Sequence, residues 1–253
     1  MWCRHSPQCK SIVQAFIPES AGYGIQTYAQ LGFALMNVVD AVNARLSVRQ
    51  FLSTPVADDQ LKSLLTDASR SPSGGNVQPW RIYVVNGESM TRMRDFLTTQ
   101  PPLDEPEYDI YPKSISEPYR TNRFTIGEQM YATLGIARED KAGRQRQFAH
   151  NNDFFGAPAA MFCYIDRQMG PPQWSDLGKF LKTLMLLAEE NGLSTCAQEY
   201  WSVRHKSVTS FVGAPDNEML FCGLAIGYAD KTAPINSLRS ERMPLSEWAT
   251  FVQ

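Results

Sequence analysis

The sequence predicts an α+β fold in which a mixed sheet is flanked by helices. Four short segments read as strands, and the last of them, residues 218–228, is apolar on both faces and is therefore expected at the centre of the sheet. The clearest helical pattern, residues 175–191, carries apolar residues at helical spacing and ends at an Asn-Gly stop signal. The other three expected strands are residues 81–85, 159–165 and 192–198.

The amino-acid composition limits the classes of protein to which this chain can belong. The chain has 253 residues, which is enough for one large domain or two small ones. Its apolar content of 43% and charged content of 20% are typical of soluble globular proteins. A net charge of −2 and a pI near 6.0 argue against a nucleic-acid partner. Without an apolar run of about 18 residues, no membrane span is expected.

The cysteines indicate free thiols in a reducing cytoplasm, because five is an odd number and they are widely spaced. Cys3 and Cys9 are close together, but no second Cys/His pair with ligand spacing follows, so we expect no metal site. Arg4 and Lys10 precede no apolar segment of the signal-peptide kind, so a secretory signal is not expected.

The chain divides into an N-terminal segment and one main domain. Residues 1–35 read as an upstream extension or leader, with Met36 as the natural start. The competing interpretation is a genuine arm that packs on a partner subunit. Residues 36–253 form the main domain, and residues 100–150, which open with five prolines between positions 100 and 118, are expected to be an insertion or lid.

Helical spacing predicts several elements of this domain. A short amphipathic helix over residues 36–45 carries Val38, Val39 and Val42. Residues 58–68 place apolar residues at i, i+3, i+4 and i+7 behind two acids in the first turn. Methionines and a phenylalanine mark a further helix after residue 88. Helical spacing returns over residues 117–138, and a mixed charge run follows.

Two motifs suggest binding chemistry. Arg45, Ser47 and Arg49 alternate, so an extended backbone would point them to one face, where guanidinium groups suit a phosphate. The alternative for them is a solvated basic surface. Residues 71–81 form a loop rich in proline and glycine, whose uncharged polar side chains suit a flat hydrogen-bonding ligand. The alternative for this loop is an ordinary helix-to-strand connection.

Four segments in order resemble the FMN-dependent nitroreductase family, of the oxygen-insensitive NAD(P)H type. They are A-R-L-S-V-R-Q-F (44–51), S-P-S-G-G-N-V-Q-P-W-R (71–81), G-L-S-T-C-A-Q-E (192–199) and N-S-L-R-S-E-R-M-P-L (236–245). The resemblance runs from Met36 to the C-terminus. It implies a mainly antiparallel sheet, an intertwined homodimer with FMN at the interface, and hydride transfer from NAD(P)H through flavin N5 to a nitroaromatic, which becomes a nitroso compound and then a hydroxylamine.

The same resemblance assigns roles to residues of this chain. Arg49 would lie near the flavin ring and stabilise negative charge on the reduced flavin. The lid would supply aromatic side chains that stack a flat substrate. Which of Arg239 and Arg242 reaches the phosphate stays open. The residues implied for FMN are Arg45, Leu46, Ser47, Arg49, Pro72, Ser73, Asn76, Gln78, Cys196, Ala197, Gln198, Arg239 and Arg242, and those implied for the lid are Tyr119, Phe124, Tyr131, Phe154 and Phe155.

No side chain is expected to act as a nucleophile. Cys196 would need a histidine base, and His150 and His205 stand in no recognisable motif. The G-L-A-I-G at residues 223–227 is not a dinucleotide fingerprint, so NAD(P)H is expected to dock over the flavin and leave before the acceptor enters, which gives ping-pong kinetics. NADPH is slightly favoured over NADH.

Three other functions stay open. One is a same-fold flavin enzyme with another acceptor, such as a dehalogenase or a flavin-consuming enzyme. A second is a flavin-binding protein without turnover. A third is a cofactor-free hydrolase that uses Cys196 or a serine.

Overall fold

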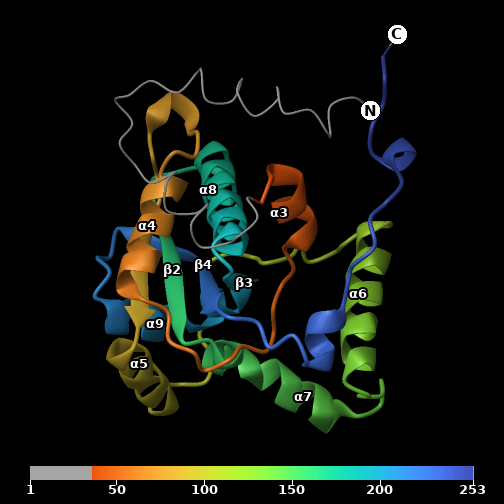
Figure 1. Ribbon diagram of the computed structural model, residues 1–253, viewed down its shortest axis with the longest axis horizontal. Helices are drawn as coiled ribbons and strands as arrows, with labels where there is room; N and C mark the ends of the chain where they lie inside the picture. Colours follow the sequence, from red (N-terminus) through yellow and green to blue (C-terminus); the bar gives the residue numbers. More distant parts are fainter. Residues whose placement is uncertain (1–35, 253) are drawn as a thin grey trace, which may run out of the picture. The chain divides into compact units, whose positions relative to one another are not determined.

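A four-stranded antiparallel sheet lies at the centre of the computed structural model, which describes residues 36–252 (Figure 1). The strand order is β1-β2-β4-β3, so β4 is central, as predicted. A single parallel bridge, from Ser47 to Thr195, extends the sheet beyond β3. The expectations for residues 1–35 lie outside the described range. The four strands match the predicted ones, with bounds Arg81–Asn86 (β1), Ala159–Asp166 (β2), Ser194–Gln198 (β3) and Glu218–Gly227 (β4).

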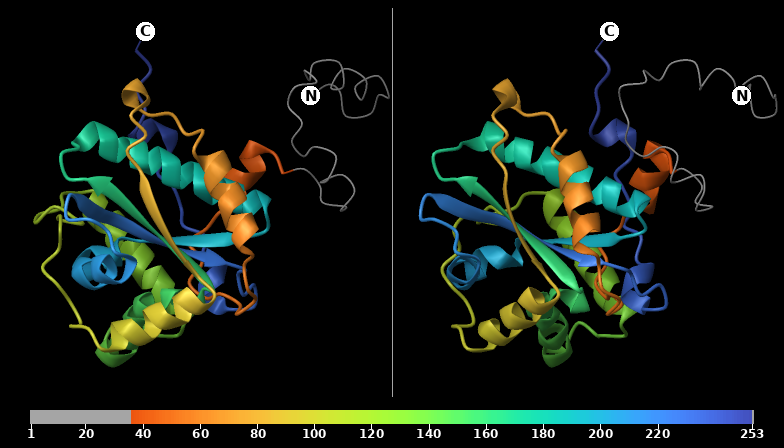
Figure 2. Two further views of the ribbon diagram at one scale, coloured as in Figure 1. Left: turned by 90° about the vertical axis from the view of Figure 1, so that its left-hand side faces the viewer. Right: turned by 60° about the vertical axis from the view of Figure 1, so that its left-hand side comes forward.

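Helices α4 (Asp58–Ala68) and α8 (Pro171–Glu190) cover one face of the sheet (Figure 2). Alternate residues of a strand point to opposite faces, and the odd-numbered residues 159–165 of β2 pack with these two helices. Helix α8 is amphipathic, as its pattern predicts, and ends at Glu190, two residues before Gly192, whose φ of 72° is left-handed.

The opposite face is covered by α5 (Glu88–Thr98), α9 (His205–Val212) and the short turns around them. Trp201 is its centre: the indole is fully buried, and its ring centroid lies 4.5 Å from that of Phe154. Gly223 of β4 lies directly beneath, and a Cβ there would come within 2.2 Å of the indole Cδ1. The absence of a side chain at this strand position is what lets the indole reach the sheet.

The segment from residue 99 to 118 has no helix or strand but is held to the body of the domain. Glu107 lies 3.0 Å from both Arg167 and His205, and it is almost completely buried. The ring of Tyr108 packs against Trp174 and Phe221. Helices α6 (Tyr119–Thr133) and α7 (Lys141–Ala149) follow, joined by paired hydrogen bonds of 2.6 and 2.7 Å from Arg144 to Glu128.

Helix α3 (Val38–Ala44) presents its apolar residues outward. Val38 is 73% exposed and Val39 66%, whereas the buried residue of this helix is Ala41. The predicted amphipathic helix is present, slightly shorter than expected, with its valines turned away from the core of this chain.

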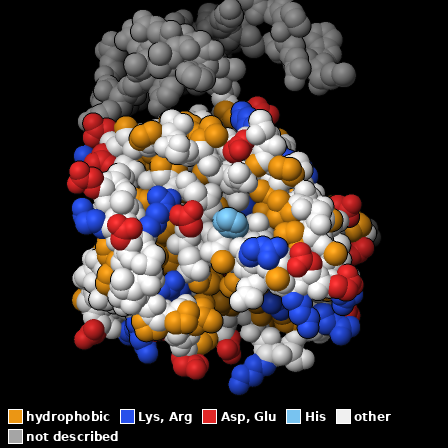
Figure 3. All heavy atoms as spheres, turned by 90° about the horizontal axis from the view of Figure 1, so that it is seen from below, with side chains coloured by type: hydrophobic (Ala, Val, Ile, Leu, Met, Phe, Trp, Pro, Cys, Tyr) orange, Lys and Arg blue, Asp and Glu red, His pale blue; other side chains and the backbone are white. Residues whose placement is uncertain are grey.

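The surface of the described residues carries no dominant charge on the side seen in Figure 3. Basic and acidic side chains are interspersed there among apolar ones. Among the described helices, none has the length and apolar content needed to cross a bilayer.

Candidate functional site

A cavity of about 500 Å³ brings together the two arginine motifs from opposite ends of the domain. Arg45 and Arg49 come from the segment after α3, which is fixed at the sheet edge because the Val48 amide donates to the Thr195 carbonyl at 3.0 Å. Arg239 and Arg242 come from the segment after β4. We call this space the cationic cavity, and its charged lining residues are Arg45, Arg49, Lys182, Arg239 and Arg242.

Asn236 joins these two segments. Its Oδ1 accepts from the Arg49 amide at 2.8 Å, and its Nδ2 donates to the carbonyls of Gln50 and Asp230 at 2.7 and 2.9 Å. One side chain thus fixes the position of the Arg49 backbone against the C-terminal segment.

The cationic cavity has the electrostatics of an anion site. Its five cations are accompanied by no acid among the described residues that line it. The Nε of Arg45 is buried and has no hydrogen-bond partner among the described residues. Burial, together with the charges of Arg45 and Arg242, lowers the pKa of Lys182. An anion entering the cavity would relieve both the unmet donor and the repulsion.

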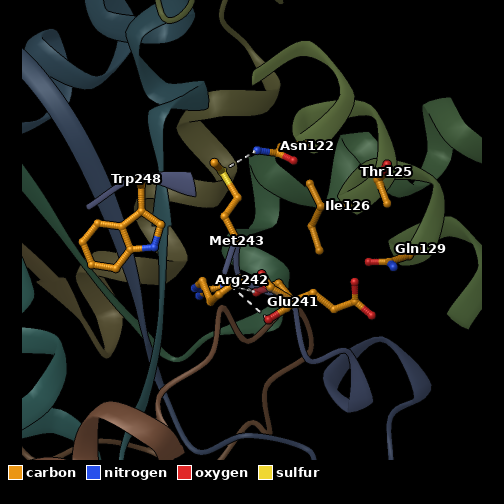
Figure 4. Close-up of a pocket in the computed structure, with 9 residues that line it drawn as sticks. Asn122, Thr125, Ile126, Gln129, Glu241, Arg242, Met243 and Trp248 are labelled. Carbon is orange, nitrogen blue, oxygen red and sulfur yellow. Dashed lines mark hydrogen bonds between the residues drawn. The ribbon is translucent and has the colours of Figure 1, made fainter. Parts of the chain in front are cut away.

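The two arginines that come from the C-terminal segment are already partly engaged. Arg239 donates to the carbonyls of Asn43 and Ala44 at 3.0 and 3.1 Å, where the C-terminal end of α3 favours a cation. Arg242 folds back and donates to Ser240 Oγ at 2.6 Å. Figure 4 shows Arg242 in an adjoining cavity of about 850 Å³, which lies between α6 and the C-terminal segment and which Asn122 and Met243, hydrogen-bonded to each other, also line.

A third cavity, of about 590 Å³, adjoins the cationic cavity at Arg49, which lines both. The end of β3 forms part of its wall through Cys196, Ala197, Gln198 and Glu199. Most of its remaining lining is apolar, and we call it the aromatic cavity after Tyr111, Tyr131, Phe148, Phe155 and Tyr200.

The wall residues of β3 have separate roles. Ala197 is exposed between two buried neighbours, so this stretch presents a small side chain to the cavity. The Gln198 amide is engaged, because Nε2 donates to Asn151 and Oε1 accepts from Trp201 at 3.2 Å. The side-chain amide is therefore already hydrogen-bonded, and the contact of Gln198 with a cofactor stays a prediction. Burial raises the pKa of Cys196 to about 11, which keeps this thiol protonated at neutral pH and agrees with the rejection of a thiolate nucleophile.

The predicted lid residues separate into three groups. Tyr131 and Phe155 line the aromatic cavity. Tyr119 and Phe124 are exposed and do not line it. Phe154 is fully buried in the core against Trp201, so it presents no face to a substrate.

Phe154 and Phe155 share an unusual backbone. Both have positive φ, 53° and 57°, a conformation that non-glycine residues seldom adopt. The turn is held because the Phe51 amide donates to the Phe155 carbonyl at 3.1 Å. This left-handed turn directs one phenylalanine into the core and the next toward the cavity. No sequence signal predicts it.

The loop at residues 71–81 lines neither the cationic nor the aromatic cavity. It lies at the N-terminal end of α8, where Asp176 Oδ2 accepts from the Gly74 amide at 3.1 Å. Pro72, Asn76 and Gln78 are exposed, and Ser73 Oγ accepts from the Gln78 amide. Within one chain, the structure does not bring this motif to the other predicted FMN residues.

Sequence reasoning missed several lining residues. Lys182 belongs to a helix whose pattern indicates only core packing. Tyr111, Arg123, Phe148 and Tyr200 had no motif around them, although their aromatic and basic character fits the lid region.

Comparison with known proteins gives consistent matches. The model of the Nitroreductase family matches residues 42–228. A nitrobenzene nitroreductase of Ectopseudomonas oleovorans is 34% identical over 84% of this chain and 96% of its own length. A 4-nitrobenzoate reductase of Pseudomonas putida is 37% identical over 80% of this chain and 90% of its own.

Solved structures agree. The crystal structure of an FMN and NADPH-dependent nitroreductase, NfnB, from Sphigopyxis sp. strain HMH is 42% identical and superimposes with a TM-score of 0.82, covering 86% of this chain and 99% of that one. The FMN-dependent nitroreductase NfnB from Mycobacterium smegmatis, in complex with NADPH, is 26% identical with a TM-score of 0.79, over 86% and 100% of the two chains.

Proposed function

Because this chain belongs to the nitroreductase family, we infer that it is an FMN-dependent oxidoreductase that reduces nitroaromatic compounds with NAD(P)H. The observation that carries this inference is the junction at Arg49 of a cavity lined by five cations with an aromatic cavity. That arrangement fits a cofactor with a phosphate at one end and a flat ring at the other. Solved relatives are described as FMN and NADPH-dependent, which favours NADPH as the donor.

The cationic cavity would hold the FMN phosphate. Arg45 supplies a buried donor without a partner, its Nε, and Lys182 supplies a second cation from α8. Ser47 lines the same cavity with a hydroxyl group, which suits the phosphate or the ribityl chain. Arg239 and Arg242 both line this cavity and both already donate hydrogen bonds within the protein, so either could turn toward the phosphate only by exchanging those bonds.

The aromatic cavity would hold the ring of the cofactor and, above it, the substrates. Bound FMN supplies hydride chemistry at N5. Arg49 places a positive charge where the two cavities meet, which favours negative charge on the ring. Ala197 leaves the wall flat, and the surrounding apolar side chains exclude water. Because the donor and the acceptor would share one space, NADPH would have to leave before the nitroaromatic enters. We therefore expect ping-pong kinetics.

We further propose that the working form is a homodimer. Val38, Val39 and Val42 of α3 are exposed, and so are Trp248 and Phe251 near the C-terminus. Burying such side chains against a second copy is favourable. A partner would also explain the loop at residues 71–81, whose polar groups would reach the cofactor of the other subunit. Light scattering of the purified protein tests this, and a monomer that retains FMN and turnover would refute it.

The buried free thiols of Cys163, Cys196 and Cys222 support a cytoplasmic location, where reduced cysteines persist.

The decisive experiment is an absorption spectrum, followed by anaerobic addition of NADPH and then of nitrobenzene. We expect flavin bands that bleach with NADPH and return with the nitro compound. A colourless protein that cannot be reconstituted with FMN would refute the proposal. Flavin that bleaches but is not reoxidised by nitroaromatics would keep the cofactor and assign a different acceptor.

A further inference from the structure

Arg123 lies on the wall of the aromatic cavity, apart from the residues proposed to hold the cofactor. It projects from α6, whereas the cofactor residues come from the segment after α3, from β3 and from the C-terminal segment. Its guanidinium Cζ lies 4.0 Å from the ring centroid of Tyr111, which lines the same cavity. Stacking of this kind occupies the face of the guanidinium and leaves its N–H groups at the edge.

The neighbouring arginines are neutralised, and Arg123 is not. Arg120 lies 2.6 Å from Glu117, and Arg144 makes a paired contact with Glu128. For Arg123, the described residues include no carboxylate within salt-bridge distance, and stacking on Tyr111 is the interaction found for it. Its fork of donors is therefore available to a ligand in the cavity.

The charges around the aromatic cavity favour an anionic aromatic ligand. Three charged residues line it: Arg49, where the cationic cavity begins, Glu199 at the end of β3, and Arg123 on α6. Glu199 is exposed at the rim, and desolvation raises its pKa above the ordinary value. Arg49 would be engaged by the cofactor, so Arg123 is the cation left for a substrate. The apolar lining suits an aromatic ring, and a guanidinium at its border suits a carboxylate on that ring.

We propose that Arg123 is a specificity residue that binds the carboxylate of an acidic nitroaromatic, so that the enzyme prefers nitrobenzoates to uncharged nitrobenzenes. This rests on the proposed function and names its substrate class. Tyr111 keeps the guanidinium at the border of the cavity. The carboxylate on Arg123 and the nitro group at the opposite end of the ring would orient the substrate with its nitro group toward Arg49.

The test compares Arg123→Ala with Arg120→Ala in the full-length FMN-loaded enzyme. Arg120 is a matched control, because it lies one turn earlier on α6, carries the same charge, is paired with Glu117 and does not line the aromatic cavity. The measurement is the ratio of kcat/KM for 4-nitrobenzoate to kcat/KM for nitrobenzene, with the KM for NADPH determined in parallel. Circular dichroism establishes that both variants are folded.

We expect the ratio to fall about tenfold in Arg123→Ala, the size of one charge-assisted contact at a half-open site, and to keep its native value in Arg120→Ala. Arg123→Lys should give an intermediate ratio, because it keeps the charge and loses the fork. An unchanged ratio in Arg123→Ala would overturn the proposal. A higher KM for NADPH with an unchanged ratio would also overturn it and assign Arg123 to a phosphate of the nucleotide.

Benzoate binding separates failure of this inference from failure of the proposed function. Benzoate carries the carboxylate but no reducible group, and its Kd can be measured by titration calorimetry of the oxidised protein. The native enzyme should bind benzoate, and Arg123→Ala should weaken that binding about tenfold. If the enzyme reduced no nitroaromatic at all, this comparison would still decide the role of Arg123.

Discussion

Replacing Arg45 with methionine should weaken FMN binding while leaving the unliganded protein nearly as stable as before. The reason is the environment of the Arg45 side chain in the unliganded protein. Its Nε is buried with no partner among the described residues, and its charge raises the cost of ionising Lys182. Methionine keeps the length and apolar stem and removes both the unmet donor and the repulsion. The substitution also removes the attraction of Arg45 for the half-buried Glu189 carboxylate, so a loss and a relief oppose each other in the empty cavity.

The magnitude follows from the contact that the ligand would gain. A hydrogen bond to a charged group contributes roughly 1.5–3 kcal/mol, which corresponds to a rise in Kd of roughly 10- to 150-fold. At a free FMN concentration of 100 times the native Kd, the native protein is stabilised by about 2.7 kcal/mol. At the same concentration the variant would gain only about 0.3–1.4 kcal/mol. Added salt should weaken FMN binding to the native protein more than to the variant.

Two measurements check this prediction. Quenching of FMN fluorescence on titration with apoprotein gives Kd, and thermal unfolding with and without FMN gives the ligand-dependent stability. Arg92→Ala is the control, since Arg92 is an exposed residue of α5 that lines neither cavity. The reasoning is refuted if the Kd of Arg45→Met stays within twofold of native. It is also refuted if the unliganded variant loses as much stability as the liganded one, because the arginine would then be structural.

Three further predictions concern packing, pH and cysteine chemistry. Gly223→Ala should lower the free energy of unfolding by about 1–3 kcal/mol in chemical denaturation, because its Cβ would overlap the immobile Trp201 indole, whereas Gly178→Ala on the open side of α8 should raise it by about 1 kcal/mol. Hydrogen bonds, chiefly from the neighbouring lysine, lower the pKa of Asp176 below its ordinary 3.8, so its stabilising contribution is present above that value and is lost as pH falls through the folded-state pKa. Asp176→Asn should therefore flatten the acid limb of a Tm-against-pH curve, and an unaltered limb would contradict this. The Cys196 thiol should resist iodoacetamide at pH 7 in the folded protein, as judged by mass spectrometry, and rapid labelling would show that it is less buried or more acidic than the structure indicates.

Local patterns were sufficient for most of the secondary structure. Helix α8 and the four strands have periods that a short window reveals, and residues 58–68 matched α4 at both ends. Helix α9 escaped prediction because Val208, Thr209 and Val212 are β-branched and the helix has only eight residues. Tertiary packing decides whether such a segment becomes a helix.

Residues of the candidate site differ in how well they can be predicted from the sequence. The alternation of Arg45, Ser47 and Arg49 is local, so their common cavity follows from one extended segment. Lys182 is different, because nothing within α8 distinguishes a lysine that faces a cavity from one that faces water. The left-handed turn at Phe154 runs against the preferences of its residues, and it persists because neighbouring packing and hydrogen bonds hold it.

The cationic cavity shows how the fold sets up binding before a ligand arrives. Like charges repel, so a cluster of cations cannot hold itself together and must be fixed by other contacts. Asn236 supplies such contacts with three uncharged hydrogen bonds that tie the segment of Arg49 to the C-terminal segment, and Val48 fixes the other side at the sheet edge. The free energy of folding is thus partly used to keep these charges close. An incoming phosphate recovers that cost, and because the backbone of Arg49 is already fixed, less ordering entropy opposes binding. Affinity for an anion at this point is therefore a property of the uncharged contacts as much as of the arginines.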